Sequence, residues 1–598
     1  MAESVDDLKI RIRELEKEVA LWKSKVKDIR YGFKWLDIPE AFDRESENKI
    51  PILEEVREKA VDAEGALATT SPHILIEGDN YHALTCLNYT HRGKIDVIYI
   101  DPPYNTGSDG FTYKDKRFLT EYPDGQKVPK DHPLRHSYWL SFMEKRLKLA
   151  KNLLSEKGAI FISIDNNEQA NLKLLCDKIF GEGNFVECFL WNRTATPSAL
   201  SHKSRKTHEY VLCYQKSDKL EYFVGMENSG GDAPLLNESN KEIVLTFPEK
   251  YVKTNLNNGI YRKGQKSRLV LLNDVYVQDG LIVNKFSLQG KFRWLQSTLN
   301  KEIENNCSLI VKSENFAIRY SRKGSRTVAP PNFLTESLYD TSIDKNSHGV
   351  DTNEKAGKEI VDILGVGSFD YPKPVSLIAY LLSLCGNSSA TILDFFAGSG
   401  TTLHATMKLN AEDGGNRQCI LIQQAEGENN ICERVTYERN RRVMQGYTNS
   451  KGEAIEGFGG HLKYYKTNFV GKHPSERATD ADNVELADKA GCLIALAENT
   501  LESVNAPESA NGFWQIYSNA EAKKHYTCIY HNGDYERVPE FVEAINALRV
   551  ADIKAKFAVY VFSWSSPDFF ENEFDDLKNI EIKAIPKPIL EIYKALNG

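Results

Sequence analysis

The chain has 598 residues, of which 41% are hydrophobic and 27% charged, and a formal net charge of −8, so we expect several domains with complete hydrophobic cores. It shows no secretory leader and no apolar run long enough to cross a bilayer, which predicts a cytoplasmic protein without membrane contact. The ten cysteines never form a CxxC pair, so the sequence supports neither a disulfide framework nor a metal site.

The first thirty residues carry a narrow apolar seam with Lys, Glu and Arg between its members. The seam follows a 4-3-4-3 spacing and consists of Leu8, Ile12, Leu15, Val19, Trp22, Val26 and Ile29. Such spacing predicts a helix that either pairs with its copy in a second subunit or packs against its own core. We assign residues 1–50 to this helical segment.

A strand-like apolar run at 95–100 leads directly into Asp101, Pro102, Pro103 and Tyr104. Two prolines in succession remove two backbone donors and fix two φ angles, which suits the outward presentation of a carbonyl. A carboxylate, a carbonyl and a tyrosine ring can together hold an exocyclic amino group and stack on the base that carries it.

The pattern after this motif alternates between helix and strand. Residues 136–153 and 168–179 are expected to form helices, and 159–164 a buried strand, which is typical of an α/β fold. Residues 207–212 predict a further strand near a base pocket, in which His208 is either structural or a base contact.

Basic residues are concentrated in the middle of the chain. Residues 471–598 hold 21 acidic and 13 basic residues, a balance of −8, so the remaining chain sums to zero. Residues 251–326 hold 14 basic and 5 acidic residues, a balance of +9, and a second basic cluster occupies 193–219. This distribution predicts a phosphate-facing surface, with a solvated charged face as the alternative. The candidate DNA contacts are Arg193, Lys203, Arg205, Arg262, Lys263, Arg293, Arg319, Arg322 and Arg326.

A second strand, 390–393, ends in a segment that begins with Asp394 and continues to Gly400. Glycines at a turn from strand to helix are the usual seat of a nucleotide-like cofactor. The next strand, 419–422, ends at Gln423, where such folds usually place an acid for the ribose hydroxyls. Asp79 is either a partner for the cofactor's adenine amino group or a turn-forming residue.

The two motifs together resemble the DNA amino-methyltransferases that use S-adenosylmethionine, with DPPY as catalytic motif and FxGxG as cofactor motif. DPPY comes first, which is the β-type permuted order. Residues 78–84 (GDNYHAL), 101–107 (DPPYNTG), 161–165 (FISID) and 369–374 (FDYPKP) are similar to modification subunits of type III restriction-modification systems. The resemblance covers about residues 30–470, and it implies a dimer, a bacterial source and a separate ATP-dependent restriction subunit. The chain itself shows no P-loop motif.

The resemblance implies a Rossmann-like α/β methyltransferase core with an inserted β-rich target-recognition domain. We expect the catalytic half at 51–190, the recognition domain at 191–350, the cofactor half at 351–470 and a small α/β module at 471–598. The expected cofactor contacts are Asp79, Lys373, Asp394, Phe395, Phe396, Gly398, Gly400, Thr401 and Gln423.

These expectations predict a site-specific adenine-N6 methyltransferase that acts on a flipped base in double-stranded DNA, as the modification subunit of a type III-like system. Asp101 and the Pro102 carbonyl would accept hydrogen bonds from the amino group and localise its lone pair for in-line attack on the methyl group. One alternative is an orphan methyltransferase with a regulatory role. Another is a DNA-binding module that recruits a nuclease without catalysis.

Overall fold

The computed structural model describes residues 35, 49–67, 70–106, 136–196, 203–220, 223–224, 226–229, 233–322, 325–334, 349–367, 369–425, 430–504, 512–519, 524–563 and 580–597. The predicted N-terminal seam lies outside these residues. The chain divides into two compact units: the first comprises residues 1–221, 332–336 and 350–598, and the second comprises residues 222–331 and 337–349.

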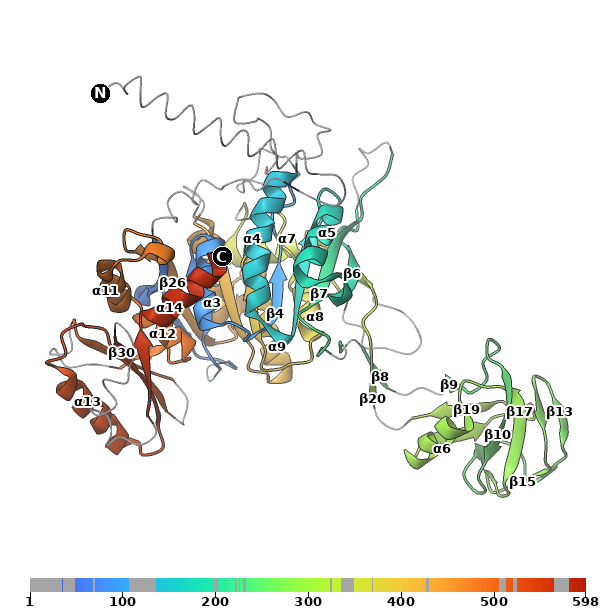
Figure 1. Ribbon diagram of the computed structural model, residues 1–598. Coiled ribbons are helices and arrows are strands. Elements are labelled where there is room, and N and C mark those ends of the chain that lie inside the picture. Colours follow the sequence, from blue (N-terminus) through green and yellow to red (C-terminus); the bar gives the residue numbers. More distant parts are fainter. Residues whose placement is uncertain are drawn as a thin grey trace, which may run out of the picture. The chain divides into compact units, whose positions relative to one another are not determined.

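The first unit is built on a large mixed sheet (Figure 1). Its strand order is β1, β26, β3, β23, β22, β4, β5, β7, β6, β21, with β2 also paired to β26. The strands are β1 (Ile50–Glu55), β2 (Val61–Ala63), β3 (His73–Glu77), β4 (Ile95–Ile100), β5 (Leu154–Ile164), β6 (Phe185–Asn192), β7 (His208–Gln215), β21 (Phe333–Leu334), β22 (Thr391–Asp394), β23 (Gln418–Gln423) and β26 (Gly460–Val470). From β26 to β5 all neighbours are parallel, whereas β7 is antiparallel to β5 and β6.

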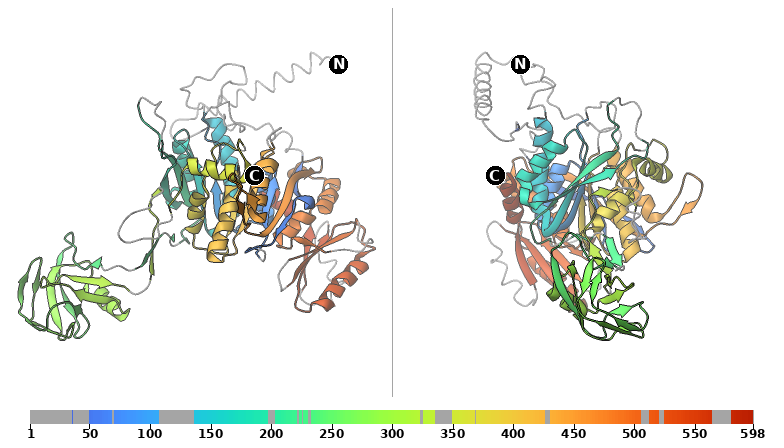
Figure 2. Two further views of the ribbon diagram at one scale, coloured as in Figure 1. Left: turned by 180° about the vertical axis from the view of Figure 1, so that it is seen from behind. Right: turned by 90° about the vertical axis from the view of Figure 1, so that its right-hand side faces the viewer.

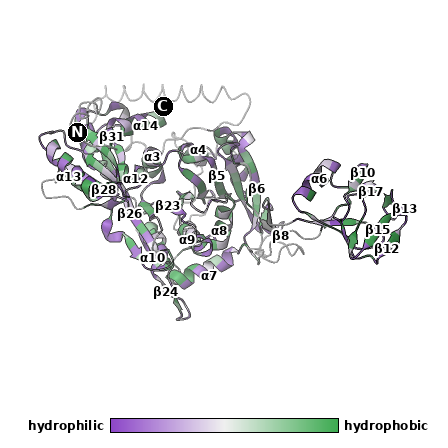
Figure 3. Cartoon of the chain, turned by 90° about the horizontal axis from the view of Figure 1, so that it is seen from below, coloured by the Kyte–Doolittle hydropathy of each residue, from purple (hydrophilic) through white to green (hydrophobic). Residues whose placement is uncertain are grey.

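Helices cover both faces of this sheet (Figure 3). One face carries α3 (Asn80–Thr90), α4 (Ser137–Leu153) and α5 (Gln169–Phe180); the other carries α7 (Asn353–Leu364), α8 (Val375–Ser383), α9 (Thr401–Asp413) and α10 (Glu438–Gln445). The strands between them are apolar over most of their length, as in His73–Glu77, where every residue is buried. This is the predicted α/β core, because sheets buried on both faces require continuous apolar strands.

The C-terminal module has a five-stranded sheet in the order β27, β28, β29, β30, β31. Its strands are β27 (Glu502–Ser503), β28 (Trp514–Ser518), β29 (His525–Tyr530), β30 (Lys556–Phe562) and β31 (Ile580–Ile585), and its helices are α11 (Asp480–Lys489), α12 (Gly491–Ala497), α13 (Val538–Ala551) and α14 (Lys587–Asn597). Apolar residues of α12 and α14 belong to the same buried cluster as those of α3. Tyr593 of α14, close to the end marked C in Figure 2, donates its hydroxyl proton to the Pro51 carbonyl over 3.1 Å.

The second unit consists mainly of short strands with a core of its own. One sheet has the order β10 (Glu242–Phe247), β17 (Phe286–Lys291), β14 (Leu269–Leu271), β13 (Gly264–Lys266). Another has the order β12 (Gly259–Tyr261), β15 (Val275–Gln278), β16 (Leu281–Ile282), β11 (Lys253–Thr254), β18 (Ser308–Val311), β19 (Ile318–Ser321), β9 (Ala233–Pro234), and helix α6 spans Gln296–Glu304. Buried aromatic and aliphatic residues from both sheets, among them Phe247 and Trp294, form this core. The unit begins at residue 222, so Arg193, Lys203 and Arg205 belong to the first unit.

Candidate active site

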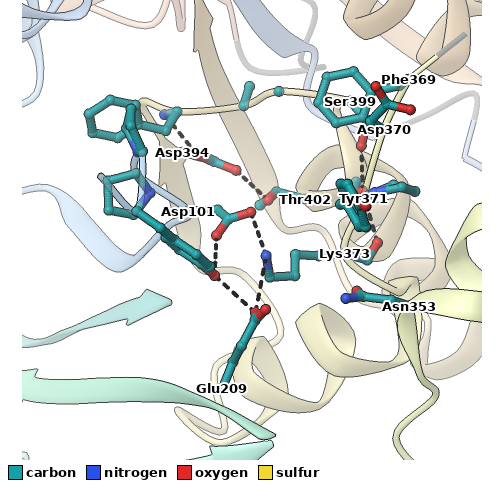
Figure 4. A pocket seen from close by; sticks show the side chains of 18 of the residues that line it. Asp101, Glu209, Asn353, Phe369, Asp370, Tyr371, Lys373, Asp394, Ser399 and Thr402 are labelled. Atoms are coloured by element: carbon teal, nitrogen blue, oxygen red, sulfur yellow. Dashed lines mark hydrogen bonds and ion pairs between the residues drawn. The ribbon is translucent and has the colours of Figure 1, made fainter. Parts of the chain in front are cut away.

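The candidate site lies where β4 and β22 end. In this parallel pair, Ile98 is the partner of Leu393. The carboxyl ends of parallel strands share one edge of a sheet. Asp101, which follows β4, and Asp394, the last residue of β22, therefore meet at that edge although a long stretch of chain separates them. Both line one cavity of about 350 Å³ (Figure 4).

The segment after β4 is held by hydrogen bonds from other elements. The Tyr104 hydroxyl lies 2.8 Å from Asp101 Oδ1 and 3.1 Å from Glu209 Oε2, with its single proton shared between them. Trp139 Nε1, from α4, donates to the Pro103 carbonyl over 2.7 Å. The tetrapeptide is thus fixed by its own prolines and by partners on α4 and β7.

A buried ammonium group lies between two carboxylates in this cavity (Figure 4). Lys373 Nζ is 2.8 Å from Asp101 Oδ2 and 3.6 Å from Glu209 Oε2. Arg193 Nη1 is 3.0 Å from Glu209 Oε1. The side chains of Lys373 and Glu209 are only 8% and 6% exposed, so their charges are poorly screened by water.

Burial and charge pairing set the protonation of this cluster. Burial raises the pKa of the Asp101 carboxyl, and the Lys373 ammonium opposes that rise only in part. Burial acts to lower the pKa of Lys373, but attraction to Asp101 and Glu209 outweighs it and the pKa is raised. Lys373 is therefore a cation at neutral pH and can serve only as a hydrogen-bond donor.

Asp394 is a buried carboxyl whose charge is not balanced by a cation among the described residues. It accepts hydrogen bonds from the Phe396 amide (3.0 Å) and the Thr402 hydroxyl (2.5 Å). Burial nevertheless raises the pKa of Asp394 to about 7. A ligand that brings its own ammonium group, as S-adenosylmethionine does, fits such a carboxylate.

The glycine loop between β22 and α9 is tightly enclosed. Gly398 and Gly400 have φ angles of 50° and 77°, in the left-handed region that favours glycine. A Cβ atom at Gly400 would lie 2.3 Å from Asn440 Nδ2. The Gly398 amide donates to Gln423 Oε1 over 2.8 Å. Any side chain at position 400 would thus displace the Asn440 amide that packs against the loop.

The helix that carries Asn440 begins with a π-helical turn, Cys432–Tyr437, and continues as α10. Thr436 donates its hydroxyl proton to the Gly398 carbonyl (2.6 Å), and Asn440 Nδ2 donates to the Gly400 carbonyl (3.2 Å). The buried Arg439 guanidinium donates to the hydroxyls of Thr401 (2.8 Å) and Ser399 (3.1 Å). Successive side chains of one helical stretch therefore hold every residue of the loop from 398 to 401.

The cavity collects most of the residues expected at the active site. These lining residues are Asp101, Pro102, Pro103, Tyr104, Arg193, Lys373, Asp394, Phe396, Gly398 and Thr401. Phe395 lies instead in the hydrophobic core. Asp79 caps α3 by accepting from the Tyr81 amide over 2.7 Å. Asp79, Phe395, Gly400 and Gln423 are absent from the described lining, and the cofactor contacts of all the expected residues stay predictions.

Glu209 is the principal site residue that the sequence did not single out. The predicted strand at 207–212 corresponds to β7 (His208–Gln215), and Glu209 is buried on it. His208, the residue weighed as a base contact, is not among the described lining residues. A carboxylate directly before the largely apolar run at 210–214 was the available signal, since a buried acid needs a partner.

The basic residues expected to contact DNA have varied surroundings. Lys203 and Arg205 are exposed, and Arg205 lines a cavity beside the active site whose wall also includes Arg193. In the second unit, Lys263 and Arg293 are exposed.

The other basic residues of the second unit lie on or beside its strands. Arg262 pairs with Asp274 over 2.8 Å, and Arg322 pairs with Glu302. Arg319 lies on β19. Arg326 lies on β20 (Ser325–Val328), and its side chain is outside the described residues.

Comparison with known proteins identifies the family. A family model described as DNA methylase, of the N6 and N4 class, matches residues 95–437, more than half of the chain. The chain belongs to this DNA methylase family. Its members use S-adenosylmethionine, which agrees with the carboxylate and glycine loop at the end of β22.

Relatives of this methylase include modification subunits of type III enzymes, which confirms the resemblance. It is 31% identical over 474 residues to the StyLTI Mod subunit of Salmonella typhimurium, covering 74% of this chain and 68% of that one. It is 32% identical to the EcoPI Mod subunit of Escherichia phage P1, covering 60% and 58%. The type II methyltransferase M.KpnI of Klebsiella pneumoniae is also 32% identical, covering 60% and 81%. The chain thus spans 58% of the length of one Mod relative and 68% of the other.

Helices long and apolar enough to span a bilayer are absent from the described part of this methylase.

Proposed function

We propose that this DNA methylase transfers a methyl group from S-adenosylmethionine to N6 of an adenine in double-stranded DNA, as the modification and specificity subunit of a type III-like system. The observation that carries the proposal is the meeting of Asp101 and Asp394 in one cavity at the edge of the sheet. The similarity to two Mod subunits supports the type III assignment.

The catalytic roles follow from the chemistry of an aromatic amino group, whose lone pair is delocalised into the ring. Asp101 and the Pro102 carbonyl accept hydrogen bonds from this group, which favours a tetrahedral nitrogen with a localised lone pair. S-adenosylmethionine, when bound, supplies the electrophilic methyl group. After transfer the nitrogen is cationic and strongly acidic, so Asp101 can accept its proton without being a strong base.

The cofactor side of the cavity is assigned to Asp394 and the loop from Gly398 to Thr401. Ionised Asp394 holds an ammonium group, and the glycines let the backbone approach the ligand closely. Phe396 adds an apolar wall.

The base must leave the duplex to reach Asp101, because the amino nitrogen is inside the double helix. Tyr104 stacks on the extruded base and offsets part of the cost of unstacking. The second unit, with its basic surface residues, binds the duplex and reads the sequence.

The experiment that tests this function is nucleoside analysis after incubation of the protein with unmethylated DNA and isotope-labelled S-adenosylmethionine. We expect label in N6-methyladenine alone. Label in N4-methylcytosine would overturn the base assignment, and no label with DNA binding retained would favour a recruitment module. Asp101→Asn serves as the control for contaminating methylases.

Self-association and a restriction partner are the remaining parts of the proposal. Deletion of residues 1–30 is expected to convert a dimer into a monomer, which light scattering would show as a halved mass. An unchanged mass would place the dimer contact elsewhere. Co-expression with an ATP-dependent restriction subunit of a type III system should give a stable complex. Similarity to the type II enzyme M.KpnI supports the alternative that the protein acts without such a partner.

A further inference from the structure

Lys373 is a buried lysine at the beginning of the segment that leads into α8, and it lines the active-site cavity. A buried ammonium group is costly unless it is paired and hydrogen-bonded. The carboxylates of Asp101 and Glu209 supply this pairing, and the Tyr104 ring centroid lies 5.0 Å from Nζ. The position therefore keeps a cation beside the carboxylate that meets the target base.

The two carboxylates do not use all the N–H donors of the Lys373 ammonium group. An ammonium group carries three donors, and the described contacts of Lys373 engage Asp101 at 2.8 Å and Glu209 at 3.6 Å. The Asp101 carboxylate has only acceptors. The cavity thus presents a hydrogen-bond acceptor and a hydrogen-bond donor side by side.

This arrangement matches one kind of base edge. In adenine the amino group is next to N1, and in cytosine it is next to N3, and both ring nitrogens are unprotonated acceptors. At the corresponding edge, guanine O6 and thymine O4 present the reverse, a carbonyl next to a ring N–H. A carboxylate and an ammonium group side by side therefore complement this edge of adenine and cytosine and oppose the same edge of guanine and thymine.

We propose that Lys373 donates a hydrogen bond to the ring nitrogen adjacent to the target amino group, while Asp101 accepts from the amino group itself. For an adenine target that ring nitrogen is N1. Glu209 is the positioning residue: it is fixed by Arg193 at 3.0 Å and by Tyr104 at 3.1 Å, and it retains the ammonium when the base draws it from Asp101. The inference rests on the proposed function of the same cavity.

The test compares adenine with 1-deazaadenine, in which a C–H group replaces N1, at the target position of a synthetic duplex. For the wild-type protein we expect kcat/KM to fall about 10- to 100-fold on 1-deazaadenine, as for loss of a hydrogen bond from a charged donor. Lys373→Met should be slower on adenine and lose nothing further on 1-deazaadenine. If the loss in kcat/KM from Lys373→Met and the loss from 1-deazaadenine multiply when combined, Lys373 does not contact N1 and the inference is overturned.

A merely structural role for Lys373 would not produce this dependence on N1. Lys358→Met, at an exposed lysine of α7, is the matched control and should retain the full wild-type discrimination. Glu209→Gln keeps the size of the positioning residue and should reduce, without abolishing, the discrimination against 1-deazaadenine. Unchanged discrimination in Glu209→Gln would contradict the role given to Glu209. Cofactor-induced thermal stabilisation confirms that each variant is folded.

Failure of the inference is separable from failure of the proposed function. If the wild-type protein methylates neither duplex, the proposed function is wrong. If it methylates both duplexes at equal rates, the function stands and only the contact between Lys373 and N1 is excluded.

Discussion

Leu393 is the partner of Ile98 on adjacent parallel strands, and this pairing places Asp394 beside Asp101. The permuted order of the two motifs is therefore compatible with one site, because strand order in the sheet and not order in the chain determines which side chains meet.

The role of Asp101 can be tested by Asp101→Asn. The amide keeps the size of the carboxylate but cannot take up the proton and holds the amino group less strongly, so methyl transfer should fall by about 10²-fold or more. DNA affinity in a filter-binding assay should stay within about twofold of wild type. Full activity in this variant would remove Asp101 from the mechanism.

The glycine loop provides a matched pair of substitutions. Gly400→Ala places a Cβ 2.3 Å from Asn440 Nδ2, whereas at Gly414, with φ 68°, nothing lies within 4 Å of an added Cβ. Gly414→Ala should therefore cost only the backbone term, about 1–2 kcal/mol of unfolding free energy. Gly400→Ala should cost about 1–3 kcal/mol more and weaken cofactor binding. Equal losses in denaturant unfolding and cofactor titration would show that the loop tolerates the added atom.

Asp394 predicts a pH dependence of cofactor binding. Because its pKa is raised to about 7, the ionised form that attracts an ammonium group becomes dominant only above that pH. Calorimetry should show affinity for S-adenosylmethionine rising between pH 6 and pH 8, about tenfold per pH unit below the pKa. Asp394→Asn should bind weakly at every pH; a similar slope in that variant would assign the titration to another group.

The Asp394 carboxyl has the opposite effect on folding stability, which falls as the pH rises. Its folded-state pKa lies above its unfolded value, so between pH 4 and pH 7 the folded protein binds the extra proton and loses stability as pH rises. Asp394→Asn removes this loss, and the Tm of the variant relative to wild type should increase from pH 5 to pH 7. A constant difference in calorimetric Tm would contradict the raised pKa.

Arg262 and Lys263 are adjacent basic residues, and comparing them distinguishes an arginine held in an ion pair from a lysine that can contact a DNA phosphate. Lys263 is exposed, whereas Arg262 is ion-paired to Asp274 at 2.8 Å. Lys263→Ala should weaken DNA binding and lower the slope of log K against log salt by about 1. Arg262→Ala should change the slope less. Identical effects would show that the ion pair opens on DNA.

The sequence allowed the core of the site to be predicted because both motifs directly follow strongly apolar strands. Asp101, Tyr104, Asp394 and Gly398 were found in this way, and the structure places them in one cavity. The contact of Lys373 with Asp101 joins residues 272 positions apart, a distance over which no local pattern operates.

Other predictions concerned residues at strand ends whose side chains could either contact the cofactor or form local hydrogen bonds. Asp79 caps α3, and Gln423 accepts from the Gly398 amide. The strand pattern predicted that these residues lie at strand ends. It could not predict their hydrogen-bond partners, which depend on tertiary packing.

The central claim is tested most directly by incubating the purified protein with unmethylated bacterial DNA and S-adenosylmethionine and mapping modified bases by long-read sequencing. We predict N6-methyladenine confined to one short motif, and none with Asp101→Asn. The absence of methylation in the presence of DNA binding, or modification confined to cytosine, would contradict the account.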